Sequence, residues 1–320
     1  MPEPVIADAW PLIADPALFG SHPVGVRAPA TSANLGPGYD SFGLALARYD
    51  EVRARVTGTG LQIDVAGAGA GQLPVDENHL VVRAMRAAFD RLGAQPPGLA
   101  LDCRNQIPHG RGLGSSAAAI VCGIELARAL STGGRQRLGD EDALALAAEL
   151  EGHPDNVAAC LLGGLSIAWL DGGCGRAIRA AEPSQVTCSG VRPVLFVPAE
   201  QSATEAARAV LPPEVSHADA AFNAGRAALL VLALTGRAEL LLAATEDRLH
   251  QGYRAADMPA SSALVAELRQ RGIAGVISGA GSSVLALATA EQEAAAMALA
   301  PSGWECVVLA IAGGAQSSVL

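Results

Sequence analysis

Two kinds of hydrophobic pattern divide the chain into predicted strands and helices. In residues 49–56 apolar side chains alternate with two arginines, which predicts a half-buried strand. We expect residues 61–65 to form its hairpin partner. In residues 78–92 apolar side chains recur three and four positions apart, and Gly93 follows, which predicts a helix and its end.

The order of the remaining patterns indicates the α+β class. Short apolar runs predict strands over residues 24–28, 99–103, 165–170, 192–198, 275–278, 283–288 and 306–310. Helical spacing predicts helices after Gly114, after Asp140 and over residues 202–211, 216–235, 238–249 and 260–271. Because strands and helices mix in a non-repeating order, a regular doubly wound sheet is not expected. The predicted organisation is an extension lying on the surface (1–22), a first domain (23–188) and a second domain (189–320).

Composition and charge narrow the class of protein. The 320 residues are 50% hydrophobic, and all 22 basic residues are arginines because the chain contains no lysine. A net charge of -10 argues against nucleic acid as a partner. The longest uncharged stretch, residues 272–290, is interrupted by glycines and serines, so no membrane-spanning segment is expected. The acidic N-terminus does not resemble a signal peptide, and six scattered cysteines predict free, mostly buried thiols in a cytoplasmic protein.

The most specific segment is a glycine-rich loop that leads into an apolar helix. Residues 108–119 read Pro-His-Gly-Arg-Gly-Leu-Gly-Ser-Ser-Ala-Ala-Ala. Backbone N–H groups and the helix dipole then point at one place, which suits a phosphate. The common P-loop is excluded because it needs a lysine, and the dinucleotide motif is excluded because these glycines are two apart. The alternative is a turn in which Ser115 or Ser116 caps the helix.

Two polar segments offer side chains for a substrate or a metal ion. Residues 29–40 contain Asn34 and Asp40, which offer an amide and a carboxylate to a ligand. The alternative is that these two side chains only brace an Asx turn. Residues 149–156 crowd together Glu149, Glu151, His153, Asp155 and Asn156. A carboxylate there suits Mg²⁺, which favours one or two carboxylates together with phosphate oxygens.

Three further features are weaker when each is taken alone. Thr204 and Arg208 lie four apart on a predicted helix and share a face, so the arginine can bind a carboxylate, although a simple capping box fits the same residues. Residues 278–284 form a glycine turn that closes over phosphates or is only a tight hairpin. Arg254 either binds a second anionic group or offsets a helix dipole.

Together these segments resemble the GHMP kinases, the superfamily of galactose, homoserine, mevalonate and phosphomevalonate kinases. The glycine loop, residues 29–38 (Pro-Ala-Thr-Ser-Ala-Asn-Leu-Gly-Pro-Gly) and residues 279–284 (Gly-Ala-Gly-Ser-Ser-Val) are similar to its three motifs. Residues 32–45, 151–158 and 202–208 resemble the branch that phosphorylates L-homoserine. The resemblance covers residues 24–310. It implies a mixed-sheet N-terminal domain, a ferredoxin-like C-terminal domain and a homodimer.

The resemblance also implies ATP, Mg²⁺ and L-homoserine as ligands and assigns residues to each. The nucleotide would be bound by Pro108, His109, Gly110, Arg111, Gly112, Leu113, Gly114, Ser115, Ser116, Ala117, Ala118, Gly279 and Gly281. Mg²⁺ would be held by Ser116, with Ser115 as second choice, and by Glu149, with Glu151 still open. L-Homoserine would be bound by Asn34, Asp40, His153, Asn156, Thr204, Arg208 and Arg254. The residues expected nearest the chemistry are Asn34, Asp40, Asp155, Asn156 and Arg208.

The reaction implied is transfer of the γ-phosphoryl group of ATP to the hydroxyl of L-homoserine in threonine biosynthesis. The resemblance favours direct attack without a strong base, although Asp155 lies where related kinases carry a catalytic aspartate. A mevalonate- or sugar-type kinase remains an alternative, which Thr204 and the two arginines disfavour because a neutral sugar offers them no carboxylate. A second alternative is a non-catalytic regulator with the same fold.

Overall fold

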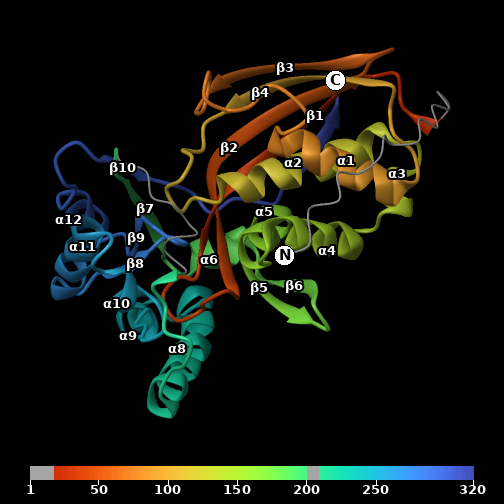
Figure 1. The fold of residues 1–320 in the computed structure, drawn as a ribbon. Coiled ribbons are helices and arrows are strands. Elements are labelled where there is room, and N and C mark those ends of the chain that lie inside the picture. The colour runs from red at the N-terminus through yellow and green to blue at the C-terminus, as the bar shows by residue number, and fades with distance from the viewer. Residues whose placement is uncertain (1–17, 200–208) are drawn as a thin grey trace.

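The computed structural model describes residues 18–199 and 209–320, whose strands form two sheets (Figure 1). The larger sheet has seven strands in the order β11-β1-β2-β4-β3, with β5 paired to β2 and β6 paired to β5. Its strands are β1 (Val24–Ala33), β2 (Phe42–Val56), β3 (Gly60–Gly67), β4 (Gly98–Asn105), β5 (Leu165–Asp171), β6 (Cys174–Ala181) and β11 (Gln316–Val319). Only β3 and β4 pair in parallel, so the sheet is mixed, as predicted.

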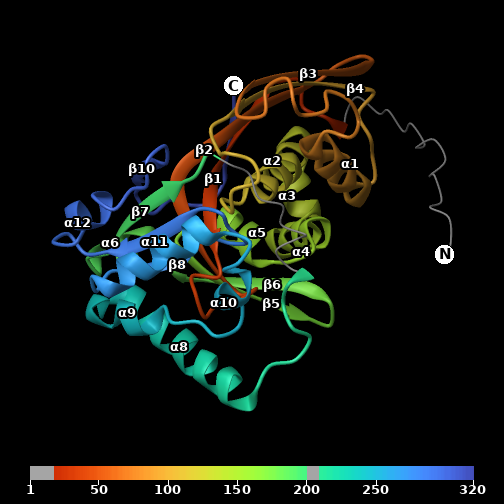
Figure 2. The same cartoon turned by 60° about the vertical axis from the view of Figure 1, so that its left-hand side comes forward.

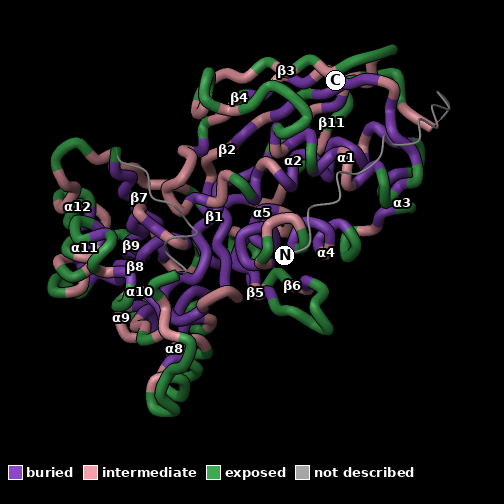
Figure 3. The backbone as a smooth tube through the Cα atoms, viewed as in Figure 1, coloured by how far each residue is buried: buried purple, intermediate pink, exposed green. Residues whose placement is uncertain are grey.

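Helices cover one face of this sheet and form the main core with it (Figures 1 and 3). They are α1 (Leu80–Leu92), α2 (Ser115–Leu130), α3 (Gly134–Arg137), α4 (Asp140–Glu151) and α5 (Asp155–Leu162). The predicted helix over 78–92 is confirmed, and Gly93 ends it in the left-handed conformation. Gly123 allows α2 to approach α1, since a Cβ there would lie 2.5 Å from the Val81 carbonyl oxygen.

The second sheet is antiparallel and confirms the ferredoxin-like expectation. Its strands β7 (Arg192–Val197), β8 (Ala274–Ile277), β9 (Val284–Ala288) and β10 (Glu305–Val308) take the order β10-β7-β9-β8. Helices in this part are α8 (His217–Thr235), α9 (Leu241–Ala244), α10 (Gln251–Arg254), α11 (Pro259–Gln270) and α12 (Glu293–Met297). Helices α8 to α11 lie between β7 and β8, and α12 lies between β9 and β10 (Figure 2). The order is therefore strand, helices, two strands, helix and strand. A short helix, α6 (Pro183–Cys188), connects the two sheets.

Three expectations about local elements differ from the structure. Residues 61–65 do not pair with β2, because β4 lies between β2 and β3. The reason is burial: β4 is mostly buried, whereas the half-exposed β3 suits the edge. The predicted helix over 238–249 breaks after α9, where Asp247 accepts hydrogen bonds from the backbone N–H groups of Leu249, His250 and Gln251. Strand β1 also runs five residues beyond its predicted end, to Ala33.

The two ends of the described chain both pack against the first part of the molecule. Strand β11 pairs with β1, so the end of the predicted second domain (189–320) belongs to the larger sheet (Figure 1). At the other end, Phe19 forms an isolated bridge with Ser131, and its ring meets that of Phe89 edge-on at 5.6 Å. The predicted N-terminal extension is therefore anchored to the core by its last residues.

Two composition-based expectations can be compared with the described residues. Helix α8 is long and apolar enough to cross a membrane by length and composition alone, which for a single helix is weak evidence. All six cysteines are free thiols, and three of them are buried. Burial raises the pKa of Cys103 to about 12, which makes its thiol unreactive.

Candidate active site

The glycine loop lies between β4 and α2 and ends at the first turn of α2. Gly110, Gly112 and Gly114 all adopt left-handed φ angles, of 64°, 70° and 66°. The first helical hydrogen bond joins Ala118 N–H to the Gly114 carbonyl. The N–H groups of residues 115–117 precede it and have no acceptor within the helix. A loop of left-handed glycines at a helix N-terminus forms a cradle for an anionic group.

The positions of these glycines have a steric cause, because the loop packs directly on atoms of distant segments. A Cβ on Gly112 would lie 2.1 Å from the Ser278 carbonyl oxygen, and one on Gly114 would lie 1.9 Å from Thr31 Oγ1. Ser278 Oγ donates to the Gly112 carbonyl at 2.7 Å. The loop is therefore packed between β1 and the glycine turn after β8.

The glycine turn over residues 278–284 closes against the first polar segment as well. Gly279 N–H donates to the Ala33 carbonyl, and Asn34 Nδ2 donates to the Gly279 carbonyl at 2.8 Å. Gly279 and Gly281 have φ angles of 57° and 93°. The structure thus brings all three glycine-rich segments together.

Other side chains of the loop are held by the surrounding backbone. Arg111 Nε donates to the Pro198 carbonyl at 2.8 Å, so this guanidinium ties the loop to the segment after β7. His109 Nε2 donates to the Ala68 carbonyl at 3.2 Å. Ala117 and Ala118 are fully buried, and Leu113 is buried beneath the loop. At these three positions only the backbone is available to a ligand.

The carboxylate beside the loop belongs to Glu151. Its Oε1 accepts a hydrogen bond from Ser116 Oγ at 2.6 Å. Glu149, the first choice for the metal, instead pairs with Arg91 on the surface, where both side chains are more than half exposed. Two residues along a helix are rotated by about 200°, so Glu149 and Glu151 point in nearly opposite directions. Of the two glutamates, the structure thus brings Glu151 and not Glu149 to the serine at the start of α2.

Burial raises the pKa of Glu151, although the Ser116 hydroxyl and His153 act against this. The described residues contain no group of three or more His, Cys, Asp or Glu side chains that could hold a metal ion. One carboxylate and one hydroxyl are nevertheless the hard oxygen donors that Mg²⁺ uses when phosphate oxygens complete its coordination. Ser116 and Glu151 therefore fit Mg²⁺ bound together with a nucleotide.

The polar residues predicted for the substrate line one small cavity next to the glycine loop. Its volume is about 70 Å³, and its lining includes Asn34, Asp40, Glu151, His153, Asp155, Asn156 and Arg254. Asn34 and Asp40 adopt left-handed φ angles of 70° and 53°, and Asn34 Oδ1 accepts the Asp40 N–H at 2.9 Å. Such backbone strain in non-glycine residues is concentrated at functional sites. The Asx-type interaction and a binding role are therefore compatible.

The opposite wall of the cavity is held by hydrogen bonds at the start of α5. Asn156 Oδ1 accepts a bond from Thr31 Oγ1 at 2.7 Å. His153 Nδ1 donates to Asp155 Oδ1, also at 2.7 Å, so this carboxylate holds the hydrogen on Nδ1. Asp155 is 2% exposed.

Arg254 contributes a buried positive charge to the same cavity. It is 2% exposed, and its guanidinium lies 5.7 Å from the centre of the Tyr39 ring. Helix α10 is only one turn long, so its dipole does not account for a buried arginine. Thr204 and Arg208, the remaining predicted substrate residues, lie outside the described residues.

A second cavity, which shares Gly110, Ser115 and Ser116 with the first, was not predicted from the sequence. It has a volume of about 250 Å³ and is lined by Pro74, Asn78, His79, Asn105, His109, Ser115 and Ser116 among others. His79 is 4% exposed, and neither of its ring nitrogens has a hydrogen-bond partner. The available signal was the pair Asn78-His79 just before an apolar helix, which the helical pattern obscured.

Comparison with known proteins places this geometry in a family. Residues 79–164 match the GHMP kinases N terminal domain, and residues 226–302 match the GHMP kinases C terminal domain. The homoserine kinase of Streptomyces coelicolor is 59% identical over 292 residues, which cover 91% of this chain and 93% of that protein. The homoserine kinase of Mycolicibacterium smegmatis is 49% identical, covering 83% and 86% of the two chains.

Solved structures agree with this assignment. The crystal structure of homoserine kinase from Cytophaga hutchinsonii superposes with a TM-score of 0.78 at 26% identity, covering 93% of this chain and 98% of that one. Mevalonate diphosphate decarboxylase from Staphylococcus aureus, at 15% identity and a TM-score of 0.63, shares the fold. The chain belongs to the homoserine kinase family of the GHMP kinases.

Proposed function

We propose that this chain transfers the γ-phosphoryl group of ATP to the side-chain hydroxyl of L-homoserine, giving O-phospho-L-homoserine and ADP in threonine biosynthesis. The observation that carries the proposal is the shared cavity. The phosphate cradle at Gly110–Gly114, the Ser116–Glu151 pair and the polar substrate wall all line it. Donor and acceptor would thus meet with the metal site between them.

The nucleotide phosphates would bind the glycine loop and the first turn of α2. Since the chain has no lysine, their charge would be balanced by backbone N–H groups, the helix dipole, arginine and Mg²⁺. Ser116 and Glu151 would hold the metal, which when bound supplies positive charge to the phosphate oxygens. The 250 Å³ cavity beside Ser115, with Asn78 and His79 in its wall, would take the nucleoside.

L-Homoserine would bind in the polar cavity with its charged groups paired. Arg254 remains positively charged when buried and suits the carboxylate, together with Arg208. Asp40 would accept the ammonium group, while Asn34, His153, Asn156 and Thr204 would orient the chain and the hydroxyl. Positioning of this kind supplies most of the catalysis in phosphoryl transfer.

The arrangement of Asp155 favours direct attack by the hydroxyl. Its Oδ1 already accepts hydrogen bonds from His153 Nδ1 and from Asn156 N–H. In the reaction the hydroxyl oxygen bonds to phosphorus, the bond to ADP breaks and the hydroxyl proton is released. Asp155 would then orient His153 rather than remove that proton.

An ADP-release assay over several alcohols tests the proposal. The full chain, with ATP and Mg²⁺, is offered L-homoserine, mevalonate, galactose and shikimate in turn. We expect ADP release that depends on L-homoserine. In the source cell, we expect the phosphorylated product in the cytoplasmic fraction. Selective turnover of another alcohol would favour a different GHMP kinase, and no turnover with any alcohol would favour a non-catalytic role.

A further inference from the structure

His250 lies buried between Arg254 and the loop that carries Asn34 and Asp40. It is 0% exposed, and its Nε2 donates to the Gly36 carbonyl at 2.8 Å. A carbonyl oxygen can only accept, so Nε2 carries the hydrogen. Nδ1 is then the acceptor for Arg254 Nη1, 3.2 Å away. One imidazole thus contacts a substrate-site arginine and the substrate-site loop through opposite nitrogens.

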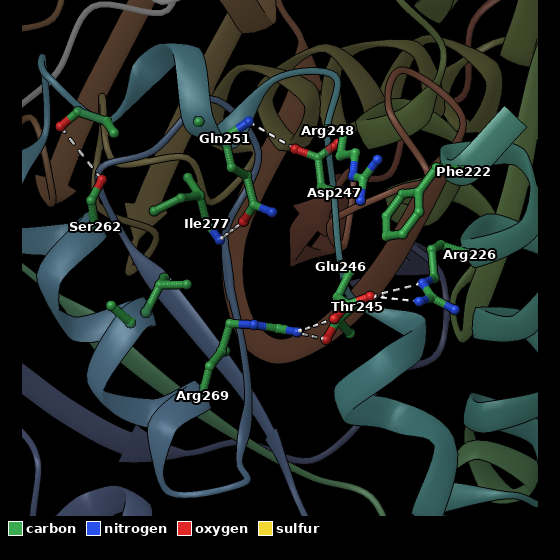
Figure 4. A pocket seen from close by; sticks show the side chains of 15 residues that line it. Phe222, Arg226, Thr245, Glu246, Asp247, Arg248, Gln251, Ser262, Arg269 and Ile277 are labelled. Atoms are coloured by element: carbon green, nitrogen blue, oxygen red, sulfur yellow. Dashed lines mark hydrogen bonds and ion pairs between the residues drawn. The ribbon is translucent and has the colours of Figure 1, made fainter. Parts of the chain in front are cut away.

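The backbone that carries His250 is fixed from its outer side. The buried Asp247 carboxylate accepts the N–H groups of Leu249, His250 and Gln251. Gln251 Oε1 accepts the Ile277 N–H at 2.7 Å, which ties this turn to β8 (Figure 4). The outer face lines a separate cavity of about 670 Å³. The His250 ring instead contacts Gly36 and Arg254, and Arg254 lines the substrate cavity.

The environment of His250 keeps the imidazole neutral. Burial lowers its pKa, and the Arg254 charge acts in the same direction, whereas Asp247, the Gly36 carbonyl and Asp40 act against them. Asp247 Oδ2 lies 3.6 Å from Nε2. The Tyr39 ring lies against the imidazole, with ring centres 5.2 Å apart and the two planes tilted by 32°. A neutral ring is required here, because a protonated Nδ1 could not accept from a guanidinium.

The loop and the turn also touch directly. Gly36 has a φ of 83°, and a Cβ there would lie 2.5 Å from the Thr245 carbonyl oxygen. Asn223 of α8 joins the same two segments: Nδ2 donates to the Pro37 carbonyl and Oδ1 accepts the Arg248 N–H, both at 2.9 Å. The position of Arg254 relative to Asn34 and Asp40 is therefore set by these contacts rather than by sequence neighbours.

We propose that His250 is a positioning residue that, through its Nδ1 atom, aims the Arg254 guanidinium at the carboxylate of the substrate, while its Nε2–H holds the loop that bears Asn34 and Asp40. The proposal rests on the proposed function, because it takes L-homoserine as the ligand of Arg254. His250 itself does not touch the substrate.

Two substitutions separate the two contacts of the ring. In His250→Asn the amide oxygen occupies the place of Nδ1, so the contact to Arg254 remains and the contact to Gly36 is lost. In His250→Gln the amide nitrogen reaches the place of Nε2, so the contact to Gly36 remains and the contact to Arg254 is lost. Since a hydrogen bond to a charged group is worth more than a neutral one, we expect H250Q to raise KM for L-homoserine about tenfold or more. KM for ATP and kcat should stay within about twofold, and H250N should raise KM for L-homoserine by less than about threefold.

The controls make the outcomes distinct. His217→Gln is the same chemical change at an exposed residue at the start of α8 and should leave all three constants unchanged. In an Arg254→Gln background, H250Q should add little, because the two substitutions act through one contact. Should H250Q not fold, His250→Ala, which keeps neither contact, replaces it in the comparison with H250N.

Equal KM values for the Asn and Gln variants, or a parallel fall in kcat and in ATP affinity, would overturn the proposal. Wild-type turnover of L-homoserine is measured first. Its absence contradicts the proposed function, whereas normal wild-type turnover with indistinguishable variants contradicts only the role of His250.

Discussion

Asp155 orients His153 through a hydrogen bond of 2.7 Å between Oδ1 and Nδ1, and the same oxygen accepts the Asn156 N–H at 2.7 Å. One oxygen of the carboxylate that a general base would use is therefore already engaged at the start of α5. Its role in the structure is to hold the hydrogen on Nδ1 of His153, a residue that lines the substrate cavity.

Replacing Asp155 by alanine should leave substantial turnover. We expect kcat to fall by about 10²-fold, in the lower part of the range for loss of one acid–base or orienting group. Steady-state kinetics over pH 6–9, with circular dichroism to verify folding, measure this. A fall beyond about 10⁴-fold in a folded variant would instead identify Asp155 as the base.

Glu151 and Glu149 provide a matched pair for testing the metal site. Glu151→Gln should reduce Mg²⁺-dependent kcat/KM by about 100-fold, because it removes the carboxylate beside Ser116. Glu149→Gln makes the same change at an exposed ion pair with Arg91 and should leave activity within about twofold. Titration of activity with Mg²⁺ distinguishes them, and equal effects would contradict the assignment to Glu151.

The raised pKa of Glu151 predicts opposite effects of pH on activity and on stability. Activity needs the ionised carboxylate, so it should fall as the pH drops through a pKa higher than the ordinary 4.5 of glutamate. Between those two values the folded chain holds a proton that the unfolded chain has lost, so this group makes stability decrease as pH rises. At pH 7.5, E151Q should therefore be as stable as the wild type or more stable in urea unfolding. A less stable variant would contradict burial as the cause.

Gly112 should not tolerate a side chain. In Gly112→Ala the Cβ would collide with the Ser278 carbonyl oxygen in addition to the strain of a left-handed residue, so the loop must move. We expect KM for ATP to rise at least tenfold, together with a loss of more than about 2 kcal/mol in unfolding free energy. Gly272→Ala carries the same kind of strain at φ 76° with no atom nearby, and should cost about 1 kcal/mol without changing KM. A normal KM in G112A would contradict the packing described for the loop.

A buried ion-pair network in α2 should support stability rather than chemistry. Glu125 and Arg128 are 2% and 3% exposed, and Glu125 also pairs with Arg135. Removing Glu125 leaves the buried Arg128 with only the mostly exposed Asp140 as a partner among the described residues, so Glu125→Ala should cost about 3 kcal/mol in unfolding free energy. Glu267→Ala, which breaks an exposed pair with Arg271, should cost less than about 0.5 kcal/mol. Calorimetry measures both, and equal costs would show that burial of the network is unimportant.

Sequence patterns predicted the parts of this molecule that depend on neighbouring residues. The helix before Gly93, the buried strand at 192–197 and the glycine loop entering α2 were predictable because helical period, apolar runs and glycine spacing are local properties. The same holds for the segments that contain Asn34, His153 and Gly281. Their chemistry pointed to phosphate and substrate binding before their positions were known.

Tertiary structure decided the features that depend on how a helix is rotated about its axis and on contacts with residues far away in the sequence. The phase of α4 brings Glu151 rather than Glu149 to Ser116, because side chains two positions apart on a helix point in nearly opposite directions. The insertion of β4 between β2 and β3, and the return of β11 to β1, depend on which strands can be buried. His250 and Asn223 meet residues 36 and 37 across about two hundred positions of sequence. By itself the sequence determined the chemical groups and the local elements of this protein. Only the packing of the two sheets and their helices decided which of those groups share a cavity, because long-range contacts have no local signature.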